Sequence, residues 1–129
     1  MDKIGIIRCE KNQDRCPLTS GLDCLRDGTQ GFSGYETGRL VGVFGCRCPG
    51  DIAVDLAKIL QAKGATIIHF PTCTVAHKSE GQWILGDGFC DHLEDLAGRI
   101  AEEVGIPCVI GTAHLPAGYT PQVFEDSAP

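Results

Sequence analysis

The chain has 129 residues, 8 of them cysteines, and a formal net charge of −6. That length fits a single domain with one hydrophobic core. The acidic balance, without a cluster of Lys or Arg, excludes nucleic acid and anionic membrane as expected partners. The apolar runs are far shorter than the ~20 residues of a membrane-spanning helix.

The first residues do not have the pattern of a secretory signal, because the apolar stretch after Met1 is short and no small-residue cleavage site follows it. We therefore expect a cytoplasmic protein. Cysteines in that compartment stay reduced, so a set of eight indicates metal binding or redox chemistry rather than four disulfides.

Four short apolar runs have the composition of buried strands. They are rich in Ile and Val and are bounded by polar or turn-forming residues, and they cover residues 3–8, 39–45, 65–70 and 108–111. Continuous apolar strands that alternate with helices are typical of a parallel sheet covered on both faces.

Two segments have the spacing of amphipathic helices. Residues 51–63 and 91–104 each place apolar side chains on one face, and Gly64 and Gly105 follow them as stop signals. Residues 9–38 must cross from the first strand to the second, and their many glycines indicate a long, loop-rich connection.

Together these elements predict an α/β fold. We expect a single three-layer domain over residues 1–115, with a mostly parallel, four-stranded, flavodoxin-like sheet in the order 2-1-3-4. Residues 116–129, which contain three prolines, are expected to form an extended C-terminal tail.

A cysteine or histidine follows each predicted strand. Cys9 comes after the first strand, Cys46 and Cys48 after the second, Cys73 after the third and His114 after the fourth. Because parallel strands lie ~4.8 Å apart and end at the same edge, these side chains should share that edge. Open α/β sheets also bind their ligands there.

Two cysteines also precede a predicted helix, Cys48 before residue 51 and Cys90 before residue 91. A helix N-terminus favours the thiolate, the form that binds metal or attacks an electrophile. By contrast, Cys108 and His69 lie inside strands and are expected to be structural. His92, in the first turn of a helix, is expected to be solvated.

At these positions the chain resembles the CGGC-domain family of small proteins from anaerobic bacteria and archaea. The resemblance runs from Ile4 to His114 and includes the start at residues 4–11, Cys16-Pro17, Cys24, Cys48-Pro49-Gly50, Cys73, Cys90, and Gly111-Thr112 before His114. Family members read Cys-Gly-Gly-Cys-Pro-Gly where this chain reads Gly45-Cys46-Arg47-Cys48-Pro49-Gly50, so the first cysteine stands one position later. The resemblance implies this fold and a metal site, usually for zinc, and implies little about a reaction.

The leading hypothesis is a metal-binding protein that holds zinc or an iron–sulfur cluster. The expected partners are the metal ion or cluster and a redox partner protein. The candidate ligands are the seven cysteines outside strand interiors and one histidine: Cys9, Cys16, Cys24, Cys46, Cys48, Cys73, Cys90 and His114.

Two alternatives use the same cysteines as reactive thiols. In the first, Cys46, Cys48 and neighbouring cysteines cycle between dithiol and disulfide. In the second, which we favour less, Cys9 and Arg15 form the C-x5-R element of a phosphatase. Residues 10–14 contain two carboxylates and no glycine, so they make a poor phosphate cradle. The sequence alone does not decide whether the protein catalyses a reaction.

One further segment, residues 81–88, holds the only tryptophan, Trp83, between glycines. It is a candidate lid or docking loop, although packing of Trp83 over the sheet would explain it equally well.

Overall fold

The computed structural model describes residues 2–35 and 37–125. Its main sheet has the strand order β2-β1-β3-β6-β7. The first four of these are parallel, and β7 pairs antiparallel with β6. The bounds are β1 (Asp2–Cys9), β2 (Gly38–Cys46), β3 (Ile67–Phe70), β6 (Cys108–Ile110) and β7 (Gln122–Phe124). The predicted α/β class and the order of the four parallel strands are confirmed.

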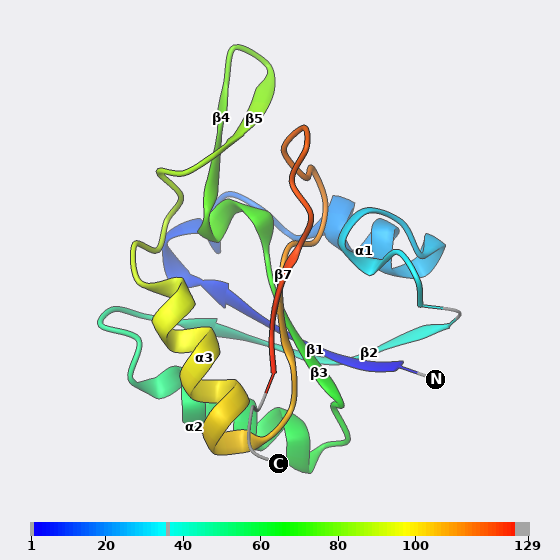
Figure 1. The fold of residues 1–129 in the computed structure, drawn as a ribbon, viewed down its shortest axis with the longest axis vertical. Helices are drawn as coiled ribbons and strands as arrows, with labels where there is room; N and C mark the ends of the chain where they lie inside the picture. Colours follow the sequence, from blue (N-terminus) through cyan, green and yellow to red (C-terminus); the bar gives the residue numbers. More distant parts are fainter. Residues whose placement is uncertain (1, 36, 126–129) are drawn as a thin grey trace.

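Helices cover both faces of this sheet. The helices α2 (Ile52–Ala62) and α3 (Leu93–Val104) lie together on one face (Figure 1). Their apolar sides share a core with Ile7 and Ile68. Because side chains alternate along a strand, Ile4 and Ile6 of β1 face the other way, where α1 (Thr19–Asp27) packs on them. The domain therefore has the three layers that the sequence predicts.

The crossover between β1 and β2 contains more regular structure than the loop we expected. It forms α1 and the two 3-10 turns η1 (Glu10–Asn12) and η2 (Gln30–Phe32). Leu18 and Leu25 beside and within α1 are buried against the sheet, and Leu22 lies between them at helical spacing. Within the C-terminal tail, residues 122–124 add the edge strand β7, which the sequence did not predict because its side chains are mostly exposed.

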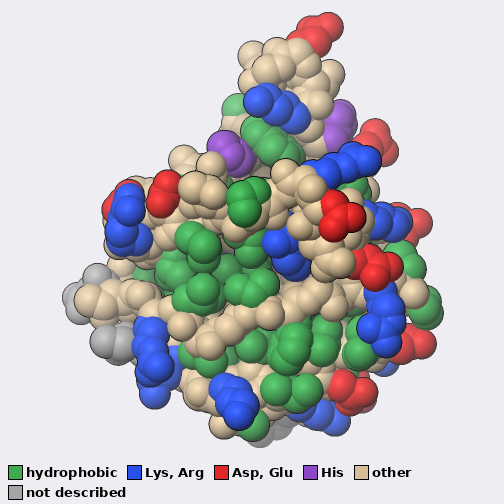
Figure 2. Space-filling view, turned by 180° about the vertical axis from the view of Figure 1, so that it is seen from behind, with side chains coloured by type: hydrophobic (Ala, Val, Ile, Leu, Met, Phe, Trp, Pro, Cys, Tyr) green, Lys and Arg blue, Asp and Glu red, His purple; other side chains and the backbone are tan. Residues whose placement is uncertain are grey.

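A second, two-stranded sheet forms a hairpin that projects from the body of the molecule (Figures 1 and 2). Its strands are β4 (Ala76–Ser79) and β5 (Gln82–Leu85), which pair antiparallel. Glu80 and Gly81 at the turn both have positive φ, 50° and 78°, as a tight two-residue hairpin turn requires. Trp83, from the stretch expected to be a lid or docking loop, therefore lies on a strand of this hairpin.

A buried histidine ties β3 to the chain on either side of it. The Nδ1–H of His69 donates to the carbonyl of Gly111 at 2.9 Å, which leaves Nε2 to accept from the Tyr35 hydroxyl at 2.7 Å. Burial lowers the pKa of His69 to about 4 and raises the pKa of Tyr35 to about 12, so both groups are neutral. His69 thus has the structural surroundings that its place in a strand indicates.

Across residues 2–35 and 37–125, every helix is too short or too polar to span a bilayer.

Candidate functional site

Two cavities lie at the edge where the parallel strands end, and they divide the cysteines between them. The smaller, of about 20 Å³, is called the thiol cavity here; its lining includes Cys9, Cys46, Cys48 and Cys90. The larger, of about 510 Å³, is called the wide cavity; its lining includes Cys16, Cys73 and His114. Seven of the eight predicted candidates, all but Cys24, thus share one edge of the sheet, but they form two groups rather than one.

The four thiols of the thiol cavity come from four separate segments. Cys9 ends β1 and Cys46 ends β2, and the two are register partners in the parallel pair. Cys48 lies in the exposed loop before α2, and Cys90 lies shortly before α3. A volume of about 20 Å³ holds roughly one water-sized sphere, so the cavity has room for a single atom or ion.

The thiols in this cavity influence one another. Burial, followed by the charges of Cys90, Cys9 and Cys48, raises the pKa of Cys46 to about 11. Burial likewise raises the pKa of Cys90, with smaller contributions from Cys9 and Cys48. Cys46 and Cys90 are therefore held as neutral thiols at neutral pH, chiefly because burial disfavours the charged form.

Arg8 supplies a positive charge to the wall of the thiol cavity. Its Nη2 donates to the carbonyl of Asn12 at 2.9 Å and to the carbonyl of Cys16. Its Nε is buried and has no partner within the described part of the chain. A buried cationic donor without an acceptor fits an anionic neighbour, such as a metal bound by several thiolates.

His92 joins the loop that carries Cys48 to the start of α3. Its Nε2 contacts the carbonyl of Pro49 at 2.8 Å, and its Nδ1 contacts Oδ1 of Asp91 at 2.7 Å. The contact with Asp91, then the one with Pro49, raises the pKa of His92. Sequence reasoning placed this side chain in solvent, because its position in a first turn does not reveal a partner that lies 43 residues away.

Gly50 brings the same loop close to α3. Its φ is +92°, and a Cβ at this position would stand 2.7 Å from Cδ1 of Leu96. Only glycine meets both conditions, so this position fixes how closely the Cys48 loop approaches the helix.

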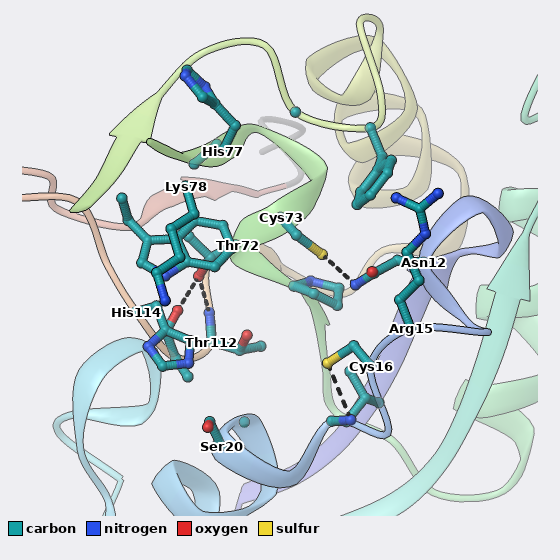
Figure 3. Close-up of a pocket in the computed structure, with 18 of the residues that line it drawn as sticks. Asn12, Arg15, Cys16, Ser20, Thr72, Cys73, His77, Lys78, Thr112 and His114 are labelled. Carbon is teal, nitrogen blue, oxygen red and sulfur yellow. Dashed lines mark hydrogen bonds between the residues drawn. The ribbon is translucent and has the colours of Figure 1, made fainter. Parts of the chain in front are cut away.

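The wide cavity lies beside the hairpin (Figure 3). The amide Nδ2 of Asn12 donates to Sγ of Cys73 at 3.1 Å. Burial raises the pKa of Cys73, and this hydrogen bond opposes the increase. Trp83 of β5 stacks on His114, with ring centroids 5.5 Å apart and planes 9° apart. Figure 3 shows the sulfurs of Cys73 and Cys16 facing the same space.

Thr72 holds together the two segments of the wide cavity that carry Cys73 and His114. Its Oγ1 donates to the carbonyl of Ala113 at 2.5 Å and accepts from the amide of Thr112 at 3.1 Å. These bonds join the end of β3 to the segment after β6. They therefore fix the positions of Cys73 and His114 relative to each other.

The remaining predicted residues lie elsewhere. Cys24 lines neither cavity and packs with the apolar cluster beneath α1. Cys108 is fully buried in the core, where burial raises its pKa to about 12. Cys9 and Arg15 line different cavities, an arrangement that does not form a C-x5-R phosphate cradle.

For the described ranges, no three or more His, Cys, Asp or Glu side chains stand ready to hold a metal ion. The chemistry of the four thiols and the unpartnered Nε of Arg8 fit a thiophilic ion, although the sulfurs have not converged on one point.

A family model, the CGGC domain, matches residues 3–113. The chain belongs to the CGGC domain family. No curated protein and no solved structure gives a significant match. In this CGGC domain the segment at the position of the family's name motif, residues 45–50, contributes Cys46, Arg47, Cys48 and Gly50 to the lining of the thiol cavity.

Proposed function

We propose that this CGGC domain is a metal-binding protein in which Cys9, Cys46, Cys48 and Cys90 bind one zinc ion. The observation that carries the proposal is that four cysteines, from four segments, line one cavity of about 20 Å³. The volume favours one ion over an iron–sulfur cluster, which needs room for several iron and sulfide atoms.

The electrostatics of the cavity support the same proposal. Thiols whose pKa values are raised by burial and by each other stay protonated until a cation displaces the protons. Arg8, with its unused Nε–H, balances part of the negative charge that four thiolates would add. The exposed loop of Cys48 gives the ion a route into the site.

Zinc would join β1, β2 and the segments before α2 and α3. A zinc ion with four sulfur ligands has no open position for a substrate, so the proposal is one of structure or metal storage and assigns no catalysed reaction.

The experiment is a cobalt and cadmium titration of protein prepared without oxygen, followed by thiolate-to-metal absorption. We expect one ion per chain, and we expect the double variant Cys9→Ser/Cys46→Ser to lose it. The double variant Cys16→Ser/Cys73→Ser, in the wide cavity, serves as the matched control and should keep it. A folded protein that stays metal-free with all its thiols titratable would refute the proposal.

A second candidate is dithiol–disulfide exchange, favoured by one observation. Cys9 and Cys46 are register partners, and neighbouring strands lie ~4.8 Å apart, within the roughly 4.4–6.8 Å Cα separation of disulfides. Their oxidation would pass two electrons and two protons to a disulfide of a partner protein. The raised pKa of Cys46 opposes this role, because redox-active thiols usually have lowered pKa values.

Thiol trapping and mass spectrometry at defined potentials test this second candidate. A reversible link between Cys9 and Cys46, or between Cys46 and Cys48, would support it, and cysteines that stay fully reduced throughout would exclude it.

A further inference from the structure

The wide cavity takes no part in the proposed zinc site, yet it has the dimensions of a ligand pocket. Its volume of about 510 Å³ lies within the roughly 300–1,000 Å³ of small-molecule sites. It shares no cysteine with the thiol cavity. The cysteines of the wide cavity are therefore distinct from the proposed zinc ligands.

The charge of this lining is opposite to that of the whole chain. Of the described residues that line the cavity, Arg15 and Lys78 are cationic and Asp87 alone is acidic. The whole chain has 11 Lys and Arg against 17 Asp and Glu. Such a local excess of positive charge on an acidic protein favours an anion.

The start of α1 adds to this positive potential. Ser20 and Gly21, in the first turn, line the cavity, and no described side chain caps the helix. The first amide groups of a helix carry a partial positive charge and have no partner within the helix.

The other walls are apolar and flat. Trp83 stacks on His114 at one side, and Phe89 lies in the lining as a second aromatic ring. Figure 3 places Arg15 and His114 at opposite sides of the space, with the sulfurs of Cys16 and Cys73 between them. A ligand that spans the cavity would therefore meet a cation at one end and an aromatic pair at the other.

We propose that the wide cavity binds a small organic anion with a flat apolar body, with its acid group at Arg15 and its body against Trp83. The positive lining selects the acid group, and the aromatic wall buries the apolar part.

Two dyes test this proposal on the full chain. Anilinonaphthalenesulfonate carries an acid group, and phenylnaphthylamine has the same rings without it. Because Trp83 is the only tryptophan, quenching of its emission reports dye bound to the chain near this residue, and the variants below place the dye in the cavity. We expect one sulfonate dye per chain, with saturable quenching and tighter binding than the neutral dye. No saturable quenching, or equal binding of the two dyes, would overturn the proposal.

Variants test separately the cation that would bind the acid group and the space that would hold the apolar body. Arg15→Gln should weaken the sulfonate dye about tenfold, the effect expected of one charged hydrogen bond, and leave the neutral dye unchanged. Ser20→Phe, at an exposed position that lines the cavity, should fill space and weaken both dyes. Lys58→Gln, an exposed site on α2 with the same change of charge, is the control. Equal effects of Arg15→Gln and Lys58→Gln would contradict the proposal.

One variant tests the zinc site and the anion site separately. The variant Cys9→Ser/Cys46→Ser, which should lose metal, should bind the sulfonate dye as the wild type does. Loss of dye binding in that variant, with the fold intact by near-ultraviolet circular dichroism, would show that the two cavities are not separate.

Discussion

The thiol cavity and the wide cavity lie at the same edge of one sheet and are both lined by cysteines, yet they differ in size by a factor of about twenty-five. The thiol cavity places four sulfur-bearing side chains around a space of about 20 Å³. The wide cavity places two around about 510 Å³, with aromatic and cationic side chains between them. The count of cysteines at an edge therefore does not define a site, because the free volume between them limits what can bind.

The difference arises in the segments that lead away from the strand ends. After β1 and β2 the chain turns tightly, and His92 and Gly50 hold the Cys48 loop against α3. After β3 the chain runs into the projecting hairpin, and α1 forms the opposite wall. The same parallel ends thus lead to a small space on one side and a large one on the other.

The largest expected effect comes from removing one thiol of the thiol cavity. Cys46→Ser should lower zinc affinity by more than about 100-fold, since even residues that only support metal ligands contribute about 10–100-fold. Competition with a chromophoric chelator measures this affinity. Cys24→Ser, outside both cavities, should bind zinc as the wild type does. Equal losses of zinc affinity in the two variants would contradict the assignment of zinc to the thiol cavity.

The pH dependence of zinc binding should be steep. Because burial and neighbouring thiols raise the pKa of Cys46 to about 11 and also raise that of Cys90, both must release protons to bind. Each released proton makes affinity rise about tenfold per pH unit, so binding should strengthen by at least that factor per unit between about pH 6 and 8. Calorimetry in buffers of different ionisation enthalpy counts the protons, and a count of zero would be inconsistent with this site.

The buried hydrogen bonds of His69 to Tyr35 and Gly111 should make the stability of the fold depend on pH. The pKa of His69 falls from 6.5 to about 4 on folding, so the unfolded chain takes up a proton over a range where the native protein does not. The free energy of unfolding should therefore fall by up to about 3 kcal/mol as the pH drops from about 6.5 to about 4. Urea unfolding at each pH measures it.

The control for this prediction is His69→Asn, which lowers stability at every pH but lacks the titrating ring. It should lose most of the slope between those pH values. A slope equal to that of the wild type would assign the effect to other groups.

A smaller effect is expected for the side chain that positions the Cys48 loop. His92→Ala should lower zinc affinity about tenfold, because the link to the carbonyl of Pro49 is lost. His92→Gln retains an N–H donor and should recover most of the affinity. If both variants bind zinc as tightly as the wild type, the loop needs no such support.

Much of the fold follows from short-range patterns in the sequence. Ile-rich runs and the helical spacing of 51–63 and 91–104 locate the elements that carry the core. The helix α1 was missed because a glycine and polar residues surround its two leucines, and β7 was missed because an edge strand with exposed side chains has little apolar pattern.

The edge that carries the candidate site was also predictable, because parallel strands must end together. The division of this edge into two cavities could not be predicted, because it depends on the positions of α1 and the hairpin in space. The same is true of Cys24, whose surroundings are set by the helix that was missed, and of His92, whose partner is distant in the sequence.

X-ray absorption of the zinc-loaded protein, prepared without oxygen, tests the central claim most directly. The account predicts four sulfur neighbours at ~2.3 Å from zinc and three in Cys9→Ser. A shell with nitrogen ligands, or one that changes in Cys73→Ser and not in Cys9→Ser, would place the metal outside the thiol cavity and contradict it.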